Sequence, residues 1–201
     1  AINNSSSGSN GSRGSSNPVG SFVSYIIEYL DGPLEDTTPI TFEAPSDSKV
    51  YDGTPLTADE VIAVGLPDGY TFTAETSGMQ IDVGVCENNI SEYRIYDTAG
   101  NDVTEQFVDV SLQKGTLTVT EANATVTTAS AEKVYDGEPL SAGDINIQGL
   151  VEADREKVTG VAIGTITDVG SVVNTYTIDW GDVNKDNYSL SEELGTLTVT
   201  A

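Results

Sequence analysis

Polar and apolar residues alternate with a period of two over much of this chain of 201 residues. The segment Gly-Thr-Leu-Thr-Val-Thr, which occurs at 115–120 and again at 195–200, sends its leucine and valine to one side and its threonines to the other. This alternation is typical of half-buried β-strands, and the turns between them are rich in Asp, Gly, Asn and Pro. The only hint of a helix lies at 57–66, where Thr57 could cap a first turn. The pattern therefore predicts a mainly β protein.

Residues 1–37 differ in composition from the rest of the chain. Residues 1–20 are rich in Ser, Gly and Asn and contain almost nothing to bury, so we expect a flexible linker or tail there. Residues 21–37 open with an aromatic and β-branched run, which predicts a leading β-strand segment with its strand at 21–30.

The remainder of the chain is an internal repeat. The sequence Lys-Val-Tyr-Asp-Gly occurs at 49–53 and again at 133–137, and both units end with Gly-Thr-Leu-Thr-Val-Thr. The spacing between equivalent positions changes only between such segments, as expected for loops of different length on a common scaffold. We therefore predict two β modules, residues 38–122 and 123–201, which join directly at 121–125 without a Gly/Ser spacer.

The repeated motif has a structural interpretation. Its valine and the leucine that follows suit a core, and its tyrosine can pack the ring while the hydroxyl stays near the surface. Asp-Gly favours a turn because glycine accepts a positive φ and aspartate bonds to nearby amides. We assign a structural turn to Tyr51, Asp52 and Gly53, and to Tyr135, Asp136 and Gly137.

A second interpretation concerns the lysine that opens each motif. The chain has few lysines, and two of them, Lys49 and Lys133, occupy equivalent places. Extracellular β modules can carry a self-formed amide crosslink between a buried lysine and an asparagine that lies beside an acid. Asn88 and Asn174 are equivalent when the two units are aligned, so they are the candidate partners. The alternative is a solvated lysine at the mouth of a turn.

The order of the motifs resembles a known family. Lys-Val-Tyr-Asp-Gly-x-Pro-Leu opens a unit, Asp-Val-Gly followed by Asn lies in its middle, and Gly-Thr-Leu-Thr-Val-Thr closes it. This order resembles the tandem Tyr-Asp-Gly (YDG-type) and related MBG-type repeat domains of bacterial cell-surface proteins, over residues 38–201. The resemblance implies two small β-rich modules, β-grasp-like or immunoglobulin-like sandwiches, in an elongated arrangement. It also implies an extracellular position on a bacterial surface, and it brings no catalytic residue.

One loop near the end of the chain has the spacing of a calcium site. Asp182, Asn184, Asp186 and Glu193 stand at positions one, three, five and twelve, which nearly matches the loop D-x-[DN]-x-[DN]-G-x5-E. Position six holds Asn187 in place of glycine, and no helix is predicted on either side. The two alternatives for this loop are a calcium site and a simple hairpin turn. No other cofactor is expected.

Charge and composition argue against several classes of function. The formal net charge of −24, from 32 acidic and 8 basic residues, repels nucleic acids and anionic lipids. The chain has no His, the usual general base, and its one cysteine, Cys86, takes the place of Val172 in the repeat, which is typical of a core side chain. No apolar run approaches the ~20 residues that span a bilayer. We expect no enzyme, no nucleic-acid partner and no membrane insertion.

Three non-catalytic functions follow from these patterns. The first is a stalk, spacer or adhesin module whose partners are neighbouring repeat modules of the same protein. The second is a self-assembling filament subunit that donates residues 1–20 and the strand at 21–30 to the sheet edge of a neighbour. The third is binding of a host glycan or protein, for which Trp180, Tyr176 and Tyr96 would supply an aromatic platform. A repeated module adds length to a protein and does not build a single active site. We therefore expect the stalk, spacer or adhesin function.

Overall fold

The structure is a computed structural model that describes residues 35–201. The predicted tail at 1–20 and the predicted strand at 21–30 lie outside the described residues. Strands joined by turns make up most of the described part, so the prediction of a mainly β protein is confirmed. No helix within residues 35–201 is long and apolar enough to cross a bilayer.

The strands fall into two sets of equal number. The first set is β1 (Ile40–Glu43), β2 (Asp47–Val50), β3 (Ile62–Val64), β4 (Thr71–Thr76), β5 (Gly84–Asn88), β6 (Ile90–Tyr96), β7 (Val110–Gln113) and β8 (Gly115–Thr120), with the 3-10 helix η1 (Thr104–Gln106). The second set is β9 (Ala122–Thr128), β10 (Ala131–Val134), β11 (Ile145–Gln148), β12 (Thr159–Ala162), β13 (Gly170–Val173), β14 (Tyr176–Asp179), β15 (Tyr188–Glu193) and β16 (Thr196–Thr200), with the α-helix α2 (Glu152–Arg155) and the 3-10 helix η2 (Lys185–Asn187).

The two modules have the same strand order. The sheets of the first are β3-β1-β7, β4-β6 and β2-β8-β5, and those of the second are β11-β9-β15, β12-β14 and β10-β16-β13. In both, the opening strand pairs in parallel with a late one, β1 with β7 and β9 with β15. Side chains repeat as well, because the hydroxyls of Thr41 and Ser111 lie 2.9 Å apart and those of Thr125 and Ser191 lie 2.7 Å apart.

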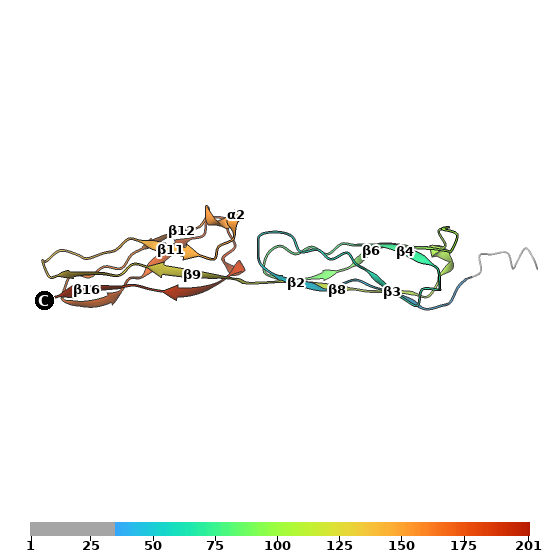
Figure 1. The fold of residues 1–201 in the computed structure, drawn as a ribbon, viewed down its shortest axis with the longest axis horizontal. Coiled ribbons are helices and arrows are strands. Elements are labelled where there is room, and N and C mark those ends of the chain that lie inside the picture. The colour runs from blue at the N-terminus through green and yellow to red at the C-terminus, as the bar shows by residue number, and fades with distance from the viewer. Residues whose placement is uncertain (1–34) are drawn as a thin grey trace, which may run out of the picture.

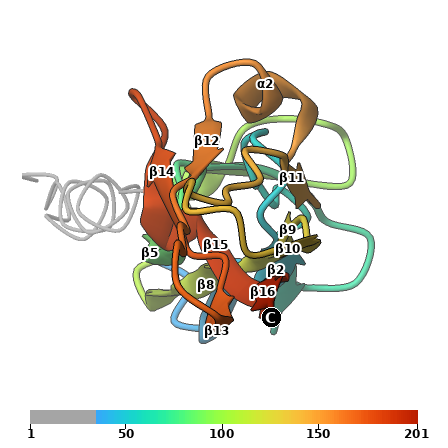
Figure 2. The same ribbon diagram turned by 90° about the vertical axis from the view of Figure 1, so that its left-hand side faces the viewer.

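The modules lie end to end, and their strands run along the long axis of the molecule (Figure 1). Viewed along this axis, one module largely covers the other (Figure 2). Strand β8 ends at Thr120 and β9 begins at Ala122, so a single residue connects the last strand of one module to the first strand of the next. This short connection gives the joint little free chain with which to bend.

Two clusters of buried apolar side chains support this arrangement. The first fills the outer half of the first module and consists of Ile40, Phe42, Ile95, Val103 and Phe107. The second crosses from one module to the other and consists of Tyr51, Leu56, Leu117, Val119, Ala122, Ala124, Leu150, Val158, Val183 and Tyr188. A buried cluster that is continuous across the boundary means that the joint is packed like a core.

The prediction of a helix at 57–66 is wrong. Strand β3 lies there and pairs antiparallel with β1, with Ala63 opposite Phe42 and packed against the outer cluster. Helix α2 instead occurs in the loop 151–158 of the second module, which is longer than the equivalent loop 67–70 of the first.

Candidate functional site: the joint between the modules

The Tyr-Asp-Gly motif of the first module forms the end of that module that faces the second. Tyr51 directly follows β2, and its N–H donates to the carbonyl of Thr120 at 2.8 Å, which fixes the tyrosine beside the end of β8. Gly53 turns the chain with a φ of 78°. A Cβ atom on Gly53 would lie 3.6 Å from Val151 and 3.9 Å from Ala153, so the turn lies against the second module.

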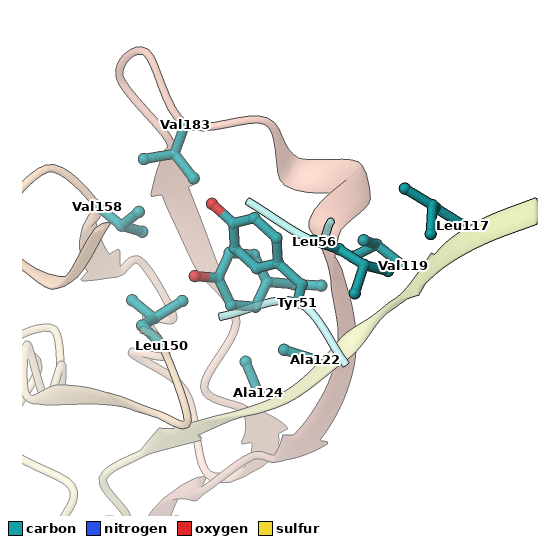
Figure 3. Close-up of a cluster of buried hydrophobic side chains, with 10 residues drawn as sticks. Tyr51, Leu56, Leu117, Val119, Ala122, Ala124, Leu150, Val158 and Val183 are labelled. Carbon is teal, nitrogen blue, oxygen red and sulfur yellow. The ribbon is translucent and has the colours of Figure 1, made fainter. Parts of the chain in front are cut away.

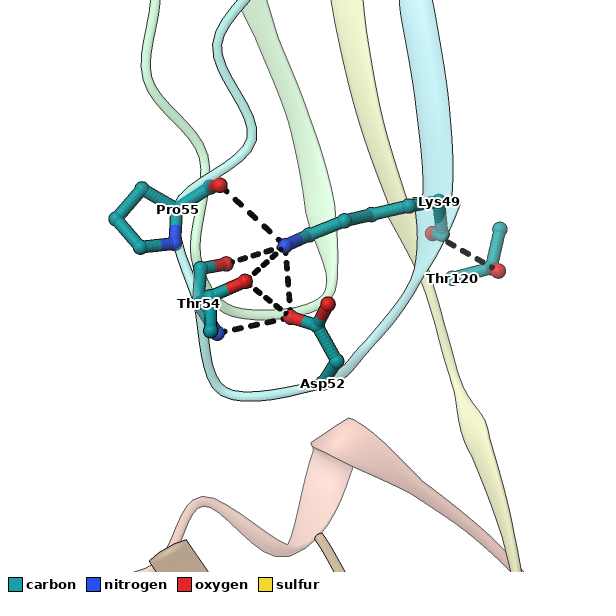
Figure 4. A network of polar contacts seen from close by, with 5 residues as sticks. All are labelled: Lys49, Asp52, Thr54, Pro55 and Thr120. Atoms are coloured by element: carbon teal, nitrogen blue, oxygen red, sulfur yellow. Dashed lines mark hydrogen bonds and ion pairs between the residues drawn. The ribbon is translucent and has the colours of Figure 1, made fainter.

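The lysine and the aspartate of the motif hold the turn together locally (Figure 4). Lys49 Nζ donates to Asp52 Oδ1 at 2.7 Å and to the carbonyl of Thr54 at 2.6 Å, while the Thr54 N–H donates to the same Asp52 oxygen at 2.8 Å. The bonds from Lys49 and Thr54 lower the pKa of Asp52 to about 2. Lys133 repeats the arrangement with Asp136 at 2.6 Å, and this bond likewise lowers the pKa of Asp136. The motif is therefore a self-contained turn in both modules.

The tyrosine makes the contact between the modules. Its hydroxyl donates to Oδ2 of Asp154 at 3.0 Å, and the hydroxyl of Tyr188 donates to the same oxygen at 2.7 Å. Tyr188 Oη in turn accepts from the N–H of Val151 at 3.2 Å. Asp154 is only 5% exposed, so its carboxyl group is shared by one tyrosine from each module inside the joint. Hydrogen bonds to a buried carboxylate are stronger than those between neutral groups.

Apolar side chains surround this polar centre. Figure 3 shows the ring of Tyr51 among Leu150, Val158 and Val183 of the second module. The rings of Tyr51 and Tyr188 meet edge to face with 5.5 Å between their centroids. This geometry is a favourable one for two aromatic rings, and it fixes how one module is rotated against the other.

A second polar contact lies beside the first. Asn187 Oδ1 accepts from the N–H of Val83 at 2.8 Å, and Asn187 Nδ2 donates to Asp82 Oδ1 at 2.7 Å. Asn187 is 1% exposed, so its amide is used entirely within the joint. The Asp-Val-Gly segment of the first module is thus held by the second module, in addition to the Tyr-Asp-Gly turn.

Burial changes the acidity of both tyrosines. Loss of contact with water raises the pKa of Tyr51 and of Tyr188 above the ordinary tyrosine value, and the hydrogen bonds to Asp154 raise each further. The neutral hydroxyl is thereby favoured, and only this form can donate to the carboxyl group of Asp154.

The candidate crosslink residues have other partners in the structure. The hydrogen bonds of Lys49 and Lys133 go to their own turns. Asn88 Nδ2 donates to the carbonyls of Pro45 and Ala58, and Asn88 Oδ1 accepts from the N–H of Gly78 at 3.0 Å. Asn174 makes the same set with Ala129, Ala142 and Gly164. Each asparagine is completely buried and ties three segments of its module together. The crosslink stays a prediction that an intact mass, one ammonia lower per bond, would reveal.

The structure does not gather the four predicted calcium ligands around one point. Asn184 accepts from the N–H of Asp186 at the start of η2, and Asp182 lies 3.6 Å from Lys157. Glu193 is at the far end of the extended strand β15, roughly 16 Å along the chain axis from Tyr188. Within residues 35–201, no three Asp, Glu or Cys side chains cluster in a way that could hold a metal ion.

The other candidate side chains are dispersed. Cys86 lies half-buried on β5 against the joint cluster, and its thiol is 3.5 Å from the carbonyl of Met79. Trp180 stacks on Tyr188 with 5.7 Å between centroids, so one face of its ring is used by the joint. The Tyr176 hydroxyl donates to Glu192, which raises the pKa of Tyr176 to about 12, while Tyr96 lies in the other module.

The sequence did not predict a role in the joint for three residues: Asp154, Asn187 and Tyr188. Asp154 lies in a loop that has no counterpart of equal length in the first module, so the repeat gave no alignment for it. The available signal was the Asn-Tyr pair at 187–188, which combines a buried amide and a ring at the start of β15.

Comparison with known families matches the second module. A family model described as "MBG domain (YGX type)" matches residues 124–198, so the predicted resemblance to YDG- and MBG-type repeats is confirmed. The match suggests a repeat module of a surface protein, and this family is not a known enzyme family. No curated protein and no solved structure matches the chain.

Proposed function

We propose that this protein is a non-catalytic spacer segment of an extracellular bacterial surface protein, in which a packed joint keeps two β modules in line. The observation that carries the proposal is the hydroxyl–carboxyl contact of Tyr51, Asp154 and Tyr188 at the boundary. A joint made for flexibility would be polar and solvated, whereas this one is buried and bonded across.

Two further features support a spacer. One residue separates β8 from β9, so the modules cannot swing on a loose linker. The net charge of −24 would keep neighbouring copies apart on a crowded surface through like-charge repulsion. Modules that each contact only their neighbours add length in proportion to their number, as in other repeat proteins.

The test measures the stiffness of the joint by pulsed electron spin resonance. Spin labels are placed at Ala99→Cys, in the turn after β6, and at Glu138→Cys, in the exposed turn of the second module, on a Cys86→Val background. Val172 occupies the place of Cys86 in the other module, so this background is expected to be tolerated. A spacer gives one narrow distance distribution.

Asp154→Ala is expected to broaden that distribution, because it removes the acceptor shared by the two tyrosines. Glu152→Ala is the matched control, because it removes an acid of the same helix whose side chain is 87% exposed and forms an ion pair with Arg155. A broad distribution in the parent protein, or no difference between the two variants, would contradict the spacer function.

A further inference from the structure

The free tip of the second module repeats the surface that the first module uses in the joint. On the first module this surface consists of Tyr51, Leu56, Asp82 and Val83, and the buried Leu117 and Val119 belong to the same cluster. The equivalent positions of the second module are Tyr135, Leu140, Asp168 and Val169, with the buried Leu197 and Val199 in the places of Leu117 and Val119. Every residue type is the same at the two places, although the modules differ at many other positions.

The backbone at the tip also has the geometry of the joint. The N–H of Tyr135 donates to the carbonyl of Thr200 at 2.8 Å, the same distance as between Tyr51 and Thr120. Gly137 has a φ of 82° against 78° for Gly53. The turn is therefore already folded at the tip, and docking there would need no reorganisation of the backbone.

The two surfaces differ in how far their side chains are exposed to solvent. Tyr51 is 7% exposed and Tyr135 is 51% exposed. A Cβ atom on Gly137 would meet nothing within 4 Å among the described residues, whereas one on Gly53 would touch the second module. The valine before each tyrosine gives the reference, because Val50 at 56% and Val134 at 65% are exposed in both modules. The difference is thus confined to positions that the joint covers.

We propose that this tip, centred on Tyr135, is a docking surface for another module of the same type. The part of that module that docks is its acidic end, meaning the end that carries a loop like 151–158 with Asp154. The partner it fits has a buried carboxyl group that accepts from the Tyr135 hydroxyl, as Asp154 does for Tyr51. It also has an amide that bonds the Asp168-Val169 segment, as Asn187 does for Asp82 and Val83. This inference rests on the proposed spacer function and names the contact by which a spacer would be extended.

A second copy of this chain is a poor partner. The acidic end of its second module, with Asp154, is already covered by its own first module. The outer end of the first module has the short loop 67–70 where the second module has 151–158 with α2. The acid of this short loop, Asp68, is exposed and lies on no helix, so it does not reproduce the position of Asp154 on α2. The tip therefore selects a module that carries the longer loop.

The test appends a copy of residues 122–201 directly after Ala201 of the full chain. This reproduces the spacing of the existing joint, in which one residue separates the two strands. The appended copy carries Tyr135→Phe, so that one Tyr135 remains to be followed. Acetylation of tyrosine hydroxyls by N-acetylimidazole, mapped by mass spectrometry, reports how accessible each hydroxyl is.

In the two-module protein we expect Tyr135 to react and Tyr51 to be protected. In the three-module protein, acetylation of Tyr135 should slow at least about tenfold, because it then requires the joint to open. Asp154→Ala in the appended copy alone should restore the reactivity, and Glu152→Ala in that copy should not. Circular dichroism checks that the appended module is folded.

Unchanged reactivity of Tyr135 in a folded three-module protein would overturn the inference. Protection of Tyr135 already in the two-module protein at high concentration would also overturn it, since a second copy would then cover the tip. These results are distinct from a failure of the spacer function, which would appear as a broad distance distribution in the two-module protein itself.

Discussion

The two copies of Lys-Val-Tyr-Asp-Gly differ in surroundings but not in sequence or local fold. In both, the lysine bonds the aspartate three residues on, at 2.7 Å for Lys49 and at 2.6 Å for Lys133. The tyrosines differ, because Tyr51 is buried in the joint and Tyr135 is half exposed at the tip. One motif thus contains two parts, a turn that forms from local contacts and a ring that becomes buried only when a neighbour is present.

This contrast explains why the motif is repeated. A residue that served only its own module would have the same exposure in both copies, as the fully buried Asn88 and Asn174 do. The tyrosine instead has an exposure that depends on its neighbour, as expected for an interface residue. Substitutions should therefore have different effects on stability at residues that serve their own module and at residues of the joint.

The largest effect is expected where the modules are alike. Asn88→Ala and Asn174→Ala each remove the side-chain partner of one buried N–H and two half-buried carbonyls, although the Ala58 carbonyl keeps the hydroxyl of Thr76. We expect the free energy of unfolding to fall by about 4 kcal/mol for each, since every such orphan costs about 1–3 kcal/mol. Urea unfolding measures this, with the exposed Asn89→Ala as control. A loss in either module no larger than that of the control would contradict this role of the asparagines.

The next largest loss of stability is expected at the tyrosine of the motif, whose surroundings differ between the two modules. Tyr51→Ala removes a buried ring and its bond to Asp154, so the free energy of unfolding should fall by about 3 kcal/mol. Tyr135→Ala makes the same chemical change at an exposed site and should stay within about 0.5 kcal/mol of the parent. Losses of equal size, measured by urea unfolding of both variants, would remove the distinction between joint and tip.

Alkaline pH should weaken the joint further. The pKa of Tyr51 is raised in the folded protein, so its protonated hydroxyl stabilises the fold fully below about pH 10, the pKa of an unfolded tyrosine. This contribution is lost as the pH rises from 10 towards the folded pKa of Tyr51. Tyr51→Phe isolates the contribution, because the other tyrosines titrate in both proteins. A gap between parent and variant that stays constant across this range would contradict the assignment.

The repeat and its strands were accessible from the sequence because they follow from local patterns. Alternation in Gly-Thr-Leu-Thr-Val-Thr identified β8 and β16, and Asp-Gly identified the turns at 52–53 and 136–137. Strand β3 was missed because the short run 62–64 follows a plausible helix cap at Thr57, and its pairing with β1 outweighs that local preference.

The joint was not accessible in the same way. The role of Tyr51 depends on Asp154, a residue 103 positions away in a loop of the other module. Spacing along the chain carries no information on such a pair, and the repeat hid it because Tyr135 has the same sequence context with no partner in the described structure. The two lysines have equivalent partners in the structure, as do the two asparagines, but the sequence does not reveal which atoms these side chains bond.

The smallest effect is expected in acid, and it tests whether the turn is independent of the joint. The bonds from Lys49 and Thr54 lower the pKa of Asp52 to about 2, and the bond from Lys133 lowers that of Asp136. A lowered folded pKa means that each turn contributes stability above about pH 4, the ordinary aspartate value, and loses it as the pH falls towards the folded pKa. NMR titration of the side-chain carboxyl carbons should therefore find Asp52 still ionised at pH 3.5 and the titration midpoint of Asp136 below that of an ordinary aspartate. If Asp136 titrated at the ordinary value while Asp52 did not, the turn would need the neighbouring module to form, and the tip would not be preorganised for docking.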